Sequence, residues 1–221
     1  DIKQVGAELA LNRFEIYGKQ PLIYNFPANF DGKESTLGIP QNNREKMPVA
    51  AIIREKGSDG DREMAWALYL AGFRVKDVHM TDLISGREDL SSVNMVVFVG
   101  GFSNADTLGS AKGWAGAFLY NEKAKDAIEK FYQREDTLSL GVCNGCQLMA
   151  ELGLITPEAR EGSPKMLHNK SHKYESAFVG VTVENSPSIM LSELTGSKLG
   201  IWVAHGEGRF SFPGDLSEYN V

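Results

Sequence analysis

Residues 137–147 read Thr-Leu-Ser-Leu-Gly-Val-Cys-Asn-Gly-Cys-Gln, and this stretch decides the fold class. The part up to Val142 predicts a strand that runs directly into Cys143. The residues after it predict a helix that ends at Gly153, because they carry an apolar stripe made of Leu148, Met149 and Leu152. A strand that turns sharply into a helix is the repeating unit of α/β proteins with a parallel sheet.

The same alternation extends upstream of this unit. Strands are predicted at 49–53, 73–78 and 95–99, and helices at 61–71 and 124–131. The first and third strands are apolar throughout, which is typical of strands covered on both faces. The sequence therefore predicts an α/β fold with a mainly parallel twisted sheet flanked by helices. Beyond Pro157, segments 177–183 and 199–204 predict later strands added to the same domain.

Composition excludes several kinds of partner. The chain has 221 residues, with 23 Lys+Arg against 29 Asp+Glu and a formal net charge of −6. An acidic balance argues against nucleic acid or an anionic membrane as the main partner, because both favour basic surfaces. The two cysteines, Cys143 and Cys146, are too few for a disulfide framework and indicate a reducing, cytoplasmic location.

The first 47 residues differ from the rest of the chain. The run 41–46 is entirely polar, and the start of the chain lacks both an initiator Met and the layout of a signal peptide. We therefore predict that residues 1–47 are a linker or tail from a preceding region, and that residues 48–221 form the main domain.

The candidate chemistry centres on Cys143. Residues 141–145, Gly-Val-Cys-Asn-Gly, fit the Gly-x-nucleophile-x-Gly elbow. A helix N-terminus stabilises a thiolate, and the N–H of Asn144 would face the position where an oxyanion forms. The turn at 100–102, Gly-Gly-Phe, could supply the second donor. The alternatives are a buried structural cysteine and a plain tight turn.

The two cysteines would also allow two other functions. Cys143 and Cys146 form a C-x-x-C pair, which allows a redox dithiol, and together with His168 and His172 they would allow a zinc site. Because both cysteines lie inside a predicted strand–turn–helix unit, we predict no metal site. The two histidines are expected to be surface residues.

A cysteine nucleophile needs a base and a group that orients the base. His205 follows a predicted strand, and Glu207 lies two residues on, so the spacing alone favours a catalytic pair. The alternative is a loop that lines or braces the site.

Three motifs together resemble one family, the glutamine amidotransferase domains of phosphoribosylformylglycinamidine synthases. They are Gly-Gly-Phe-Ser at 100–103, Cys-Asn-Gly-Cys-Gln at 143–147, and Ala-His-Gly-Glu-Gly-Arg at 204–209. The likeness runs from about Val49 to Phe212, and Cys146 resembles the large single-chain form. The resemblance implies a class I, triad-type amidotransferase fold, which is flavodoxin-like with added C-terminal strands.

The resemblance implies a reaction and the residues that perform it. Cys143 attacks the side-chain amide of glutamine and forms a thioester, and the released ammonia reaches synthetase domains of the same longer polypeptide. There it converts formylglycinamide ribonucleotide to the amidine, in purine biosynthesis, with ATP and Mg²⁺. No cofactor is implied for this chain itself. Gln147 would help to hold glutamine, and Gly101 and Phe102 with Asn144 would form the oxyanion hole.

The chain departs from the family pattern in one respect. The family's catalytic His and Glu lie in a later Pro-His-Pro-Glu-Arg motif, and this chain ends at Val221 without it. We therefore expect a domain that is incomplete at its C-terminus and inactive in isolation, in which His205 and Glu207 have a bracing role at most. Two other hypotheses stay open: a non-catalytic docking module, and a cysteine hydrolase or chaperone-like protein on a related fold.

Overall fold

The structure, a computed structural model, describes residues 2–17, 24–28, 30–33, 36, 38, 44–156 and 162–219. It divides the chain into two compact units. The smaller unit combines residues 1–30 with 176–204, and the larger one combines 31–175 with 205–221. All the candidate site residues named above lie in the larger unit.

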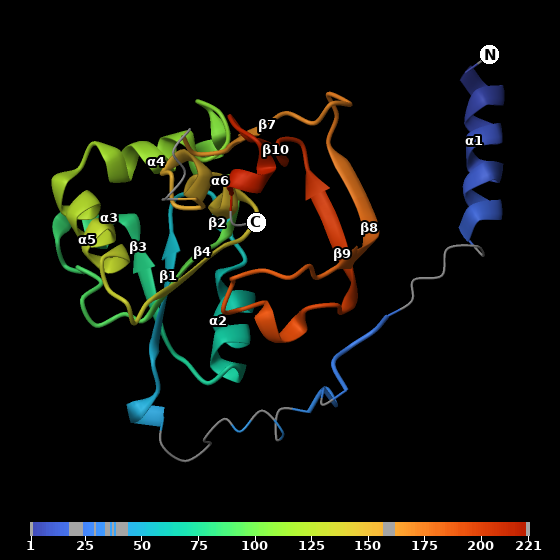
Figure 1. The fold of residues 1–221 in the computed structure, drawn as a ribbon. Helices are drawn as coiled ribbons and strands as arrows, with labels where there is room; N and C mark the ends of the chain where they lie inside the picture. Colours follow the sequence, from blue (N-terminus) through green and yellow to red (C-terminus); the bar gives the residue numbers. More distant parts are fainter. Residues whose placement is uncertain are drawn as a thin grey trace. The chain divides into compact units, whose positions relative to one another are not determined.

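A four-stranded parallel sheet forms the centre of the larger unit (Figure 1). Its strands, in spatial order, are β3 (Arg74–His79), β1 (Val49–Arg54), β4 (Met95–Phe98) and β6 (Leu138–Gly141). In chain order this arrangement is 2-1-3-4, which is the order of a flavodoxin-like sheet. The predicted parallel α/β architecture is thereby confirmed.

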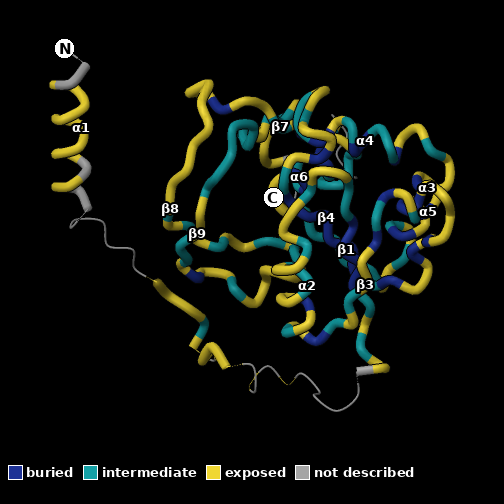
Figure 2. Tube along the Cα trace, turned by 180° about the vertical axis from the view of Figure 1, so that it is seen from behind, coloured by how far each residue is buried: buried dark blue, intermediate teal, exposed yellow. Residues whose placement is uncertain are grey.

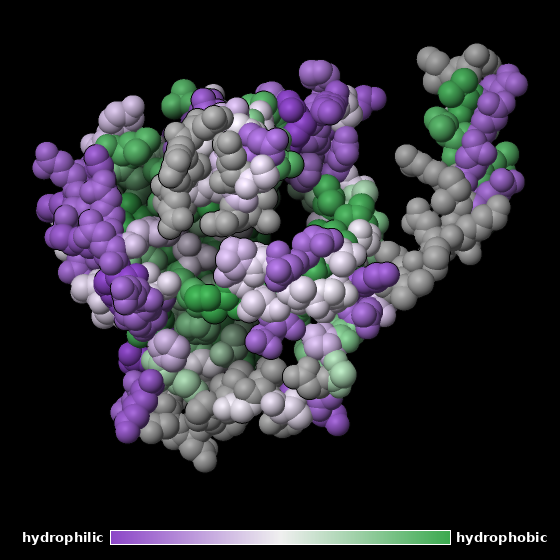
Figure 3. Space-filling view, viewed as in Figure 1, coloured by the Kyte–Doolittle hydropathy of each residue, from purple (hydrophilic) through white to green (hydrophobic). Residues whose placement is uncertain are grey.

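Helices alternate with these strands, as the sequence predicted. They are α2 (Asp61–Leu70), α3 (Met80–Ser85), α4 (Lys112–Leu119), α5 (Glu122–Tyr132) and α6 (Asn144–Glu151). Helix α5 shows why: its apolar residues recur at helical spacing and are buried, whereas its charged residues form the hydrophilic surface seen in Figure 3. The side chain of Asn121 caps it by accepting a hydrogen bond from the Ala124 N–H at 3.0 Å.

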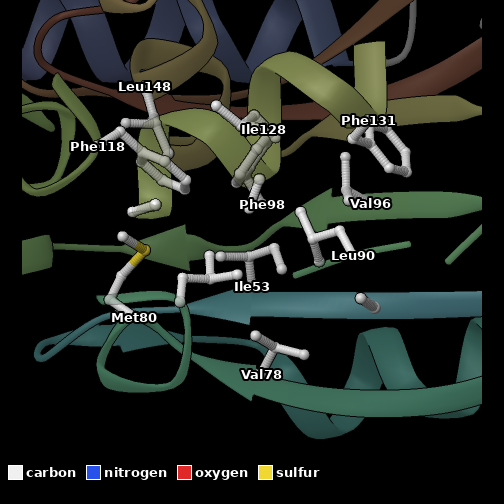
Figure 4. Packing of buried hydrophobic residues seen from close by; sticks show 14 of the residues in the cluster. Ile53, Val78, Met80, Leu90, Val96, Phe98, Phe118, Ile128, Phe131 and Leu148 are labelled. Atoms are coloured by element: carbon white, nitrogen blue, oxygen red, sulfur yellow. The ribbon is translucent and has the colours of Figure 1, made fainter. Parts of the chain in front are cut away.

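The sheet is covered on both faces, and side-chain alternation along β1 shows this directly. Ala51 and Ile53 pack in the core cluster that includes residues of α3 to α6, whereas Ala50 and Ile52 pack in the cluster that includes Leu68 of α2. Figure 2 shows β1 and β4 as buried. Figure 4 shows Val96 and Phe98 of β4 facing Phe131 and Ile128 of α5, with Ile53 of β1 on the same side of the sheet. This double coverage explains why these strands are apolar throughout.

Two short antiparallel strand pairs lie outside the parallel sheet. β2 (Ser58–Asp59) pairs antiparallel with β5 (Gly100–Gly101), and β7 (Lys165–Leu167) pairs antiparallel with β10 (Arg209–Ser211). Among the described residues there are also short 3-10 segments: η2 (Arg44–Lys46), η3 (Ser103–Asp106), η4 (Ser192–Leu194) and η5 (Leu216–Glu218). In η3 the backbone of Asn104 and Ala105 is not helical.

The predicted later strands form a sheet of their own. They are β8 (Glu175–Thr182) and β9 (Lys198–His205), and they pair with each other rather than with the parallel sheet. In the smaller unit, Phe178 and Trp202 pack with ring centroids 5.8 Å apart, and Asn25 bridges to Lys198.

The first 47 residues contain a helix that the sequence did not predict, α1 (Ile2–Tyr17), in which Phe14 is exposed. Residues 41–43 of the polar run lie outside the described residues. The division into a tail at 1–47 and a domain at 48–221 stays a prediction. Within the described ranges, no helix is both long enough and apolar enough to cross a membrane.

Candidate active site

Cys143 occupies a sharp bend between strand and helix. β6 ends at Gly141 and α6 begins at Asn144, so the cysteine is the N-cap residue of the helix. Its backbone lies at φ 53° and ψ −114°, in the region that favours glycine. A residue held in such a conformation is strained, and such strain clusters at functional sites. The side chain is exposed.

The glycines on either side of Cys143 have steric reasons to be there. A Cβ at Gly145 would lie 2.0 Å from the carbonyl oxygen of Phe98, and a Cβ at Gly141 would lie 2.8 Å from the Cα of Cys146. Both contacts are with backbone, which cannot move aside as a flexible side chain could. Gly145 therefore lets α6 pack against β4, and Gly141 lets α6 fold back closely on β6.

The two thiols differ in environment. Cys143 is exposed, whereas Cys146 lies half-buried in the first turn of α6. Burial is the main cause that raises the pKa of Cys146, and the neighbouring Cys143 raises it further. Because the thiolate is the reactive form, Cys146 is the poorer nucleophile of the pair.

This difference predicts site-selective alkylation. Treatment of the chain with iodoacetamide at pH 8 is expected to modify Cys143 at least about tenfold faster than Cys146, since burial raises the pKa of Cys146 and limits access to its sulfur. Peptide mass spectrometry over a time course measures the two rates. Equal rates would contradict the burial of Cys146.

The turn at 100–102 lies beside Cys143, but one of its N–H groups is already engaged. A Cβ at Gly100 would lie 3.1 Å from the Cβ of Cys143. The Phe102 N–H donates to the carbonyl oxygen of Gly57 at 2.8 Å. The Asn144 N–H, in contrast, has no hydrogen-bond acceptor within the described part of the chain. The oxyanion hole formed by Gly101, Phe102 and Asn144 stays a prediction.

The side chain of Gln147 ties α6 to the segment that contains Glu207. Its Nε2 donates to the Glu207 carbonyl oxygen at 3.0 Å, and its Oε1 accepts from Asn144 Nδ2 at 3.1 Å. Both ends of the amide are therefore occupied by the protein itself. The predicted role of Gln147 in holding glutamine stays a prediction.

His205 and Glu207 point to other partners than Cys143. The Nδ1 of His205 lies 2.9 Å from Asn169 Oδ1, and a carboxylate oxygen of Glu207 lies 3.2 Å from His168 Nδ1. Over the ranges that the structure describes, no hydrogen bond reaches the sulfur of Cys143. The bracing role of the pair stays a prediction.

The buried Asn169 organises this segment, and sequence reasoning missed it. Its side-chain amide donates to the carbonyl oxygens of His205 and Lys173, at 2.8 and 3.0 Å, and its N–H donates to the Gly206 carbonyl oxygen. In the sequence, Asn169 is one polar residue within the polar run 168–173, and such a run is typical of exposed surface. Among the described residues, no group of three or more His, Cys, Asp or Glu side chains could hold a metal ion.

The fold and this geometry define a class: a parallel α/β protein with an exposed cysteine on a strand–helix elbow. The chain belongs to the family of CobB/CobQ-like glutamine amidotransferase domains, whose family model matches residues 47–220. The resemblance inferred from the three motifs is thereby confirmed at the level of the family.

Individual relatives agree with this membership. The chain is 50% identical over 176 residues to the probable phosphoribosylformylglycinamidine synthase, chloroplastic/mitochondrial, of Arabidopsis thaliana, covering 77% of this chain and 12% of the relative. It is 46% identical over 187 residues to the human phosphoribosylformylglycinamidine synthase, covering 79% and 14%. The solved structure of PurLQS from Thermotoga maritima matches with a TM-score of 0.60 and 27% identity, covering 76% of this chain and 71% of that one. The chain thus spans 12 to 14% of the length of these two curated relatives.

Proposed function

We propose that this domain is the glutaminase part of a phosphoribosylformylglycinamidine synthase. The observation that carries the proposal is the exposed thiol of Cys143, held at a positive φ between β6 and α6. Membership of the glutamine amidotransferase family supports glutamine as the substrate, and the identity to two synthases supports the larger reaction.

The chemistry follows from the position of the thiol. The Cys143 thiolate attacks the carboxamide carbon of glutamine, and the Asn144 N–H donates to the oxyanion that forms. Collapse of this intermediate breaks the C–N bond, and the leaving nitrogen takes up a proton and departs as ammonia. Water then hydrolyses the glutamyl thioester, which gives glutamate and restores the thiol.

Other parts of the reaction would fall to groups that do not contact Cys143. A general base is needed, and none of the described side chains hydrogen-bonds to the sulfur, so we expect the chain on its own to turn over slowly or not at all. The ammonia would be consumed by synthetase domains of the same polypeptide, which would use ATP and Mg²⁺. The cytoplasmic location stays a prediction.

The missing base contact also motivates a second candidate function, a docking module that keeps the elbow but performs no chemistry. A cysteine hydrolase or chaperone-like protein would share the reactive thiol without any preference for glutamine. Labelling with a chloroketone analogue of glutamine separates the glutaminase from these two alternatives, because alkylation needs a thiolate and a glutamine-shaped pocket but no general base.

The expected result is saturable labelling of Cys143 in the purified chain. Glutamine at ten times its Kd should slow the labelling about tenfold by competition. Asparagine, which is one methylene shorter, serves as the matched control and should protect at least about threefold less. Labelling that neither saturates nor responds to glutamine would reject the glutaminase in favour of one of the other two functions.

A further inference from the structure

The side-chain amide of Asn144 is almost completely buried, at 1% exposure, directly after Cys143. Its Oδ1 accepts from the N–H and the hydroxyl of Ser103, at 3.1 and 2.5 Å. Its Nδ2 donates to Asp106 Oδ1 and to Gln147 Oε1, both at 3.1 Å. A carboxamide has two lone pairs and two N–H groups to offer, so its hydrogen-bonding capacity is fully used.

The direction of these bonds is fixed at each end. The backbone N–H of Ser103 can only donate, and the carboxylate oxygen of Asp106 also accepts from the Ala111 N–H, so the amide of Asn144 has one workable orientation. The orientation of the Gln147 amide is then fixed as well, because its Nε2 must face the Glu207 carbonyl oxygen, which can only accept. No other side chain of similar size supplies the same two donors and two acceptors.

A second path joins the same groups and closes a ring. Asp106 Oδ2 accepts from the Ser110 hydroxyl at 3.4 Å, and the Ser110 N–H donates to Glu207 Oε2 at 3.4 Å. These two contacts are the longest in the ring, so the bonds of Asn144 hold most of it together. We call Asn144, Asp106, Ser110, Glu207 and Gln147 the Asn144 ring.

The loop that the ring holds is strained. Asn104, Ala105 and Asp106 have φ values of 51°, 55° and 48°, three successive residues in the left-handed region. L-residues avoid this conformation because the Cβ comes too close to the following carbonyl oxygen. Such a run persists only where surrounding contacts over-determine it. The bonds from Asp106 to Asn144 and to the Ala111 N–H, at 3.1 and 3.3 Å, provide such contacts.

We propose that Asn144 is a positioning residue for the thiol. Its carboxamide locks loop 103–110 and, through Gln147, the segment at Glu207 onto the first turn of α6. It thereby fixes the direction of the Cys143 sulfur and of the Asn144 N–H. This inference rests on the proposed function for its meaning in catalysis, although the ring itself is a property of the fold.

Exchanging the two partners tests the ring. In Asn144→Asp, an acceptor replaces the donor that faces the acceptors on Asp106 and Gln147, which leaves buried acceptors facing one another. We expect kcat for glutamine hydrolysis by the full-length synthase to fall about 10- to 30-fold, with KM changed less than about threefold. Combining Asn144→Asp with Asp106→Asn restores a donor opposite an acceptor at the contact between residues 106 and 144. Gln147 Oε1 still faces an acceptor, and the Ala111 N–H loses its acceptor, so kcat should recover only in part, by about threefold over Asn144→Asp.

A readout without glutamine keeps the two proposals distinguishable. The rate at which iodoacetamide alkylates Cys143 in the purified chain should fall at least about fivefold in Asn144→Asp and recover in part in the double variant. Asn104→Asp makes the same chemical change on an exposed residue of the same loop and should leave the rate within about twofold. If Asn144→Asp does not fold, Asp106→Ala replaces it, and the same fall in alkylation rate is expected.

Each outcome is informative. An alkylation rate that Asn144→Asp leaves unchanged, or that Asn104→Asp lowers equally, would overturn the positioning role. The same holds for a double variant that shows no recovery. If the alkylation rates follow the expectation while no variant or parent hydrolyses glutamine, the ring stands and the proposed function fails.

Discussion

On the proposed function, replacing Cys143 by serine is expected to lower glutamine-dependent ammonia release at least about 10⁴-fold, measured in a full-length protein that contains this domain. Removing a nucleophile removes the covalent path altogether, and losses of about 10⁶-fold are known for such changes. Serine is nearly isosteric but is far less ionised than a thiol at neutral pH, so the geometry stays while the reactivity goes. Ammonia is measured with a coupled glutamate dehydrogenase assay. Activity with added ammonium salt in place of glutamine should be retained, because the proposed synthetase step would not use the thiol.

The neighbouring cysteine provides the matched control. Cys146→Ser makes the same chemical change three residues along the same helix, at a half-buried position. We expect its glutaminase rate to stay within about threefold of the parent. Equal losses from both variants would contradict the assignment of Cys143 as the nucleophile, as would full activity of Cys143→Ser.

Replacing Gly145 by alanine is expected to destabilise the larger unit by about 3 kcal/mol or more. The added methyl carbon would lie 2.0 Å from the Phe98 carbonyl oxygen, and 2.8 Å from the Phe98 Cβ, so helix and strand must separate. For a chain of this size, that loss corresponds to a fall in Tm of about 6–12 °C. Urea unfolding followed by circular dichroism measures the free energy of unfolding.

Gly116 in α4 is the control for this change. A Cβ there would meet its nearest neighbour, a ring carbon of Tyr120, at 3.7 Å, which is an ordinary contact. Gly116→Ala should therefore stabilise the chain by about 0.5–1 kcal/mol through helix propensity alone. Similar destabilisation in both variants would show that the close approach at Gly145 is not the cause.

Much of the fold could be predicted because the two central strands, β1 and β4, are buried on both sides. The apolar run at 49–53 becomes β1 with one residue added, and the amphipathic residues at 124–131 lie within α5. The helix α1 was missed because its apolar residues follow no single face, and its exposed side chains, such as Phe14, bury nothing. The later strands were located, but their pairing into a separate sheet depends on contacts between residues far apart in sequence.

The candidate site, like the fold, has parts that could be predicted from the sequence and parts that could not. The elbow around Cys143 could be predicted because its Gly-x-Cys-x-Gly pattern is short and contiguous, although the contact that requires Gly145 is with the distant Phe98. The partners of Asn144, Gln147 and Asn169 could not, since each joins segments about 36 to 60 residues apart. His205 is an example: its spacing to Glu207 favoured a catalytic role, whereas in the structure its Nδ1 forms a hydrogen bond with the side chain of Asn169.

Phe98 links the hydrophobic interior to the reactive sulfur. Its ring meets Trp114 and Phe118 edge-on at 6.1 Å, while its carbonyl oxygen accepts from the Val142 N–H and faces Gly145. If a substitution in the core shifts the Phe98 ring, the Phe98 carbonyl group should shift with it. The turn that carries Cys143 packs against that carbonyl group and should therefore move as well. The rate at which the Cys143 thiol is modified should therefore depend on how the core around Phe98 packs. Measuring that rate can detect the effect of substitutions in the buried core.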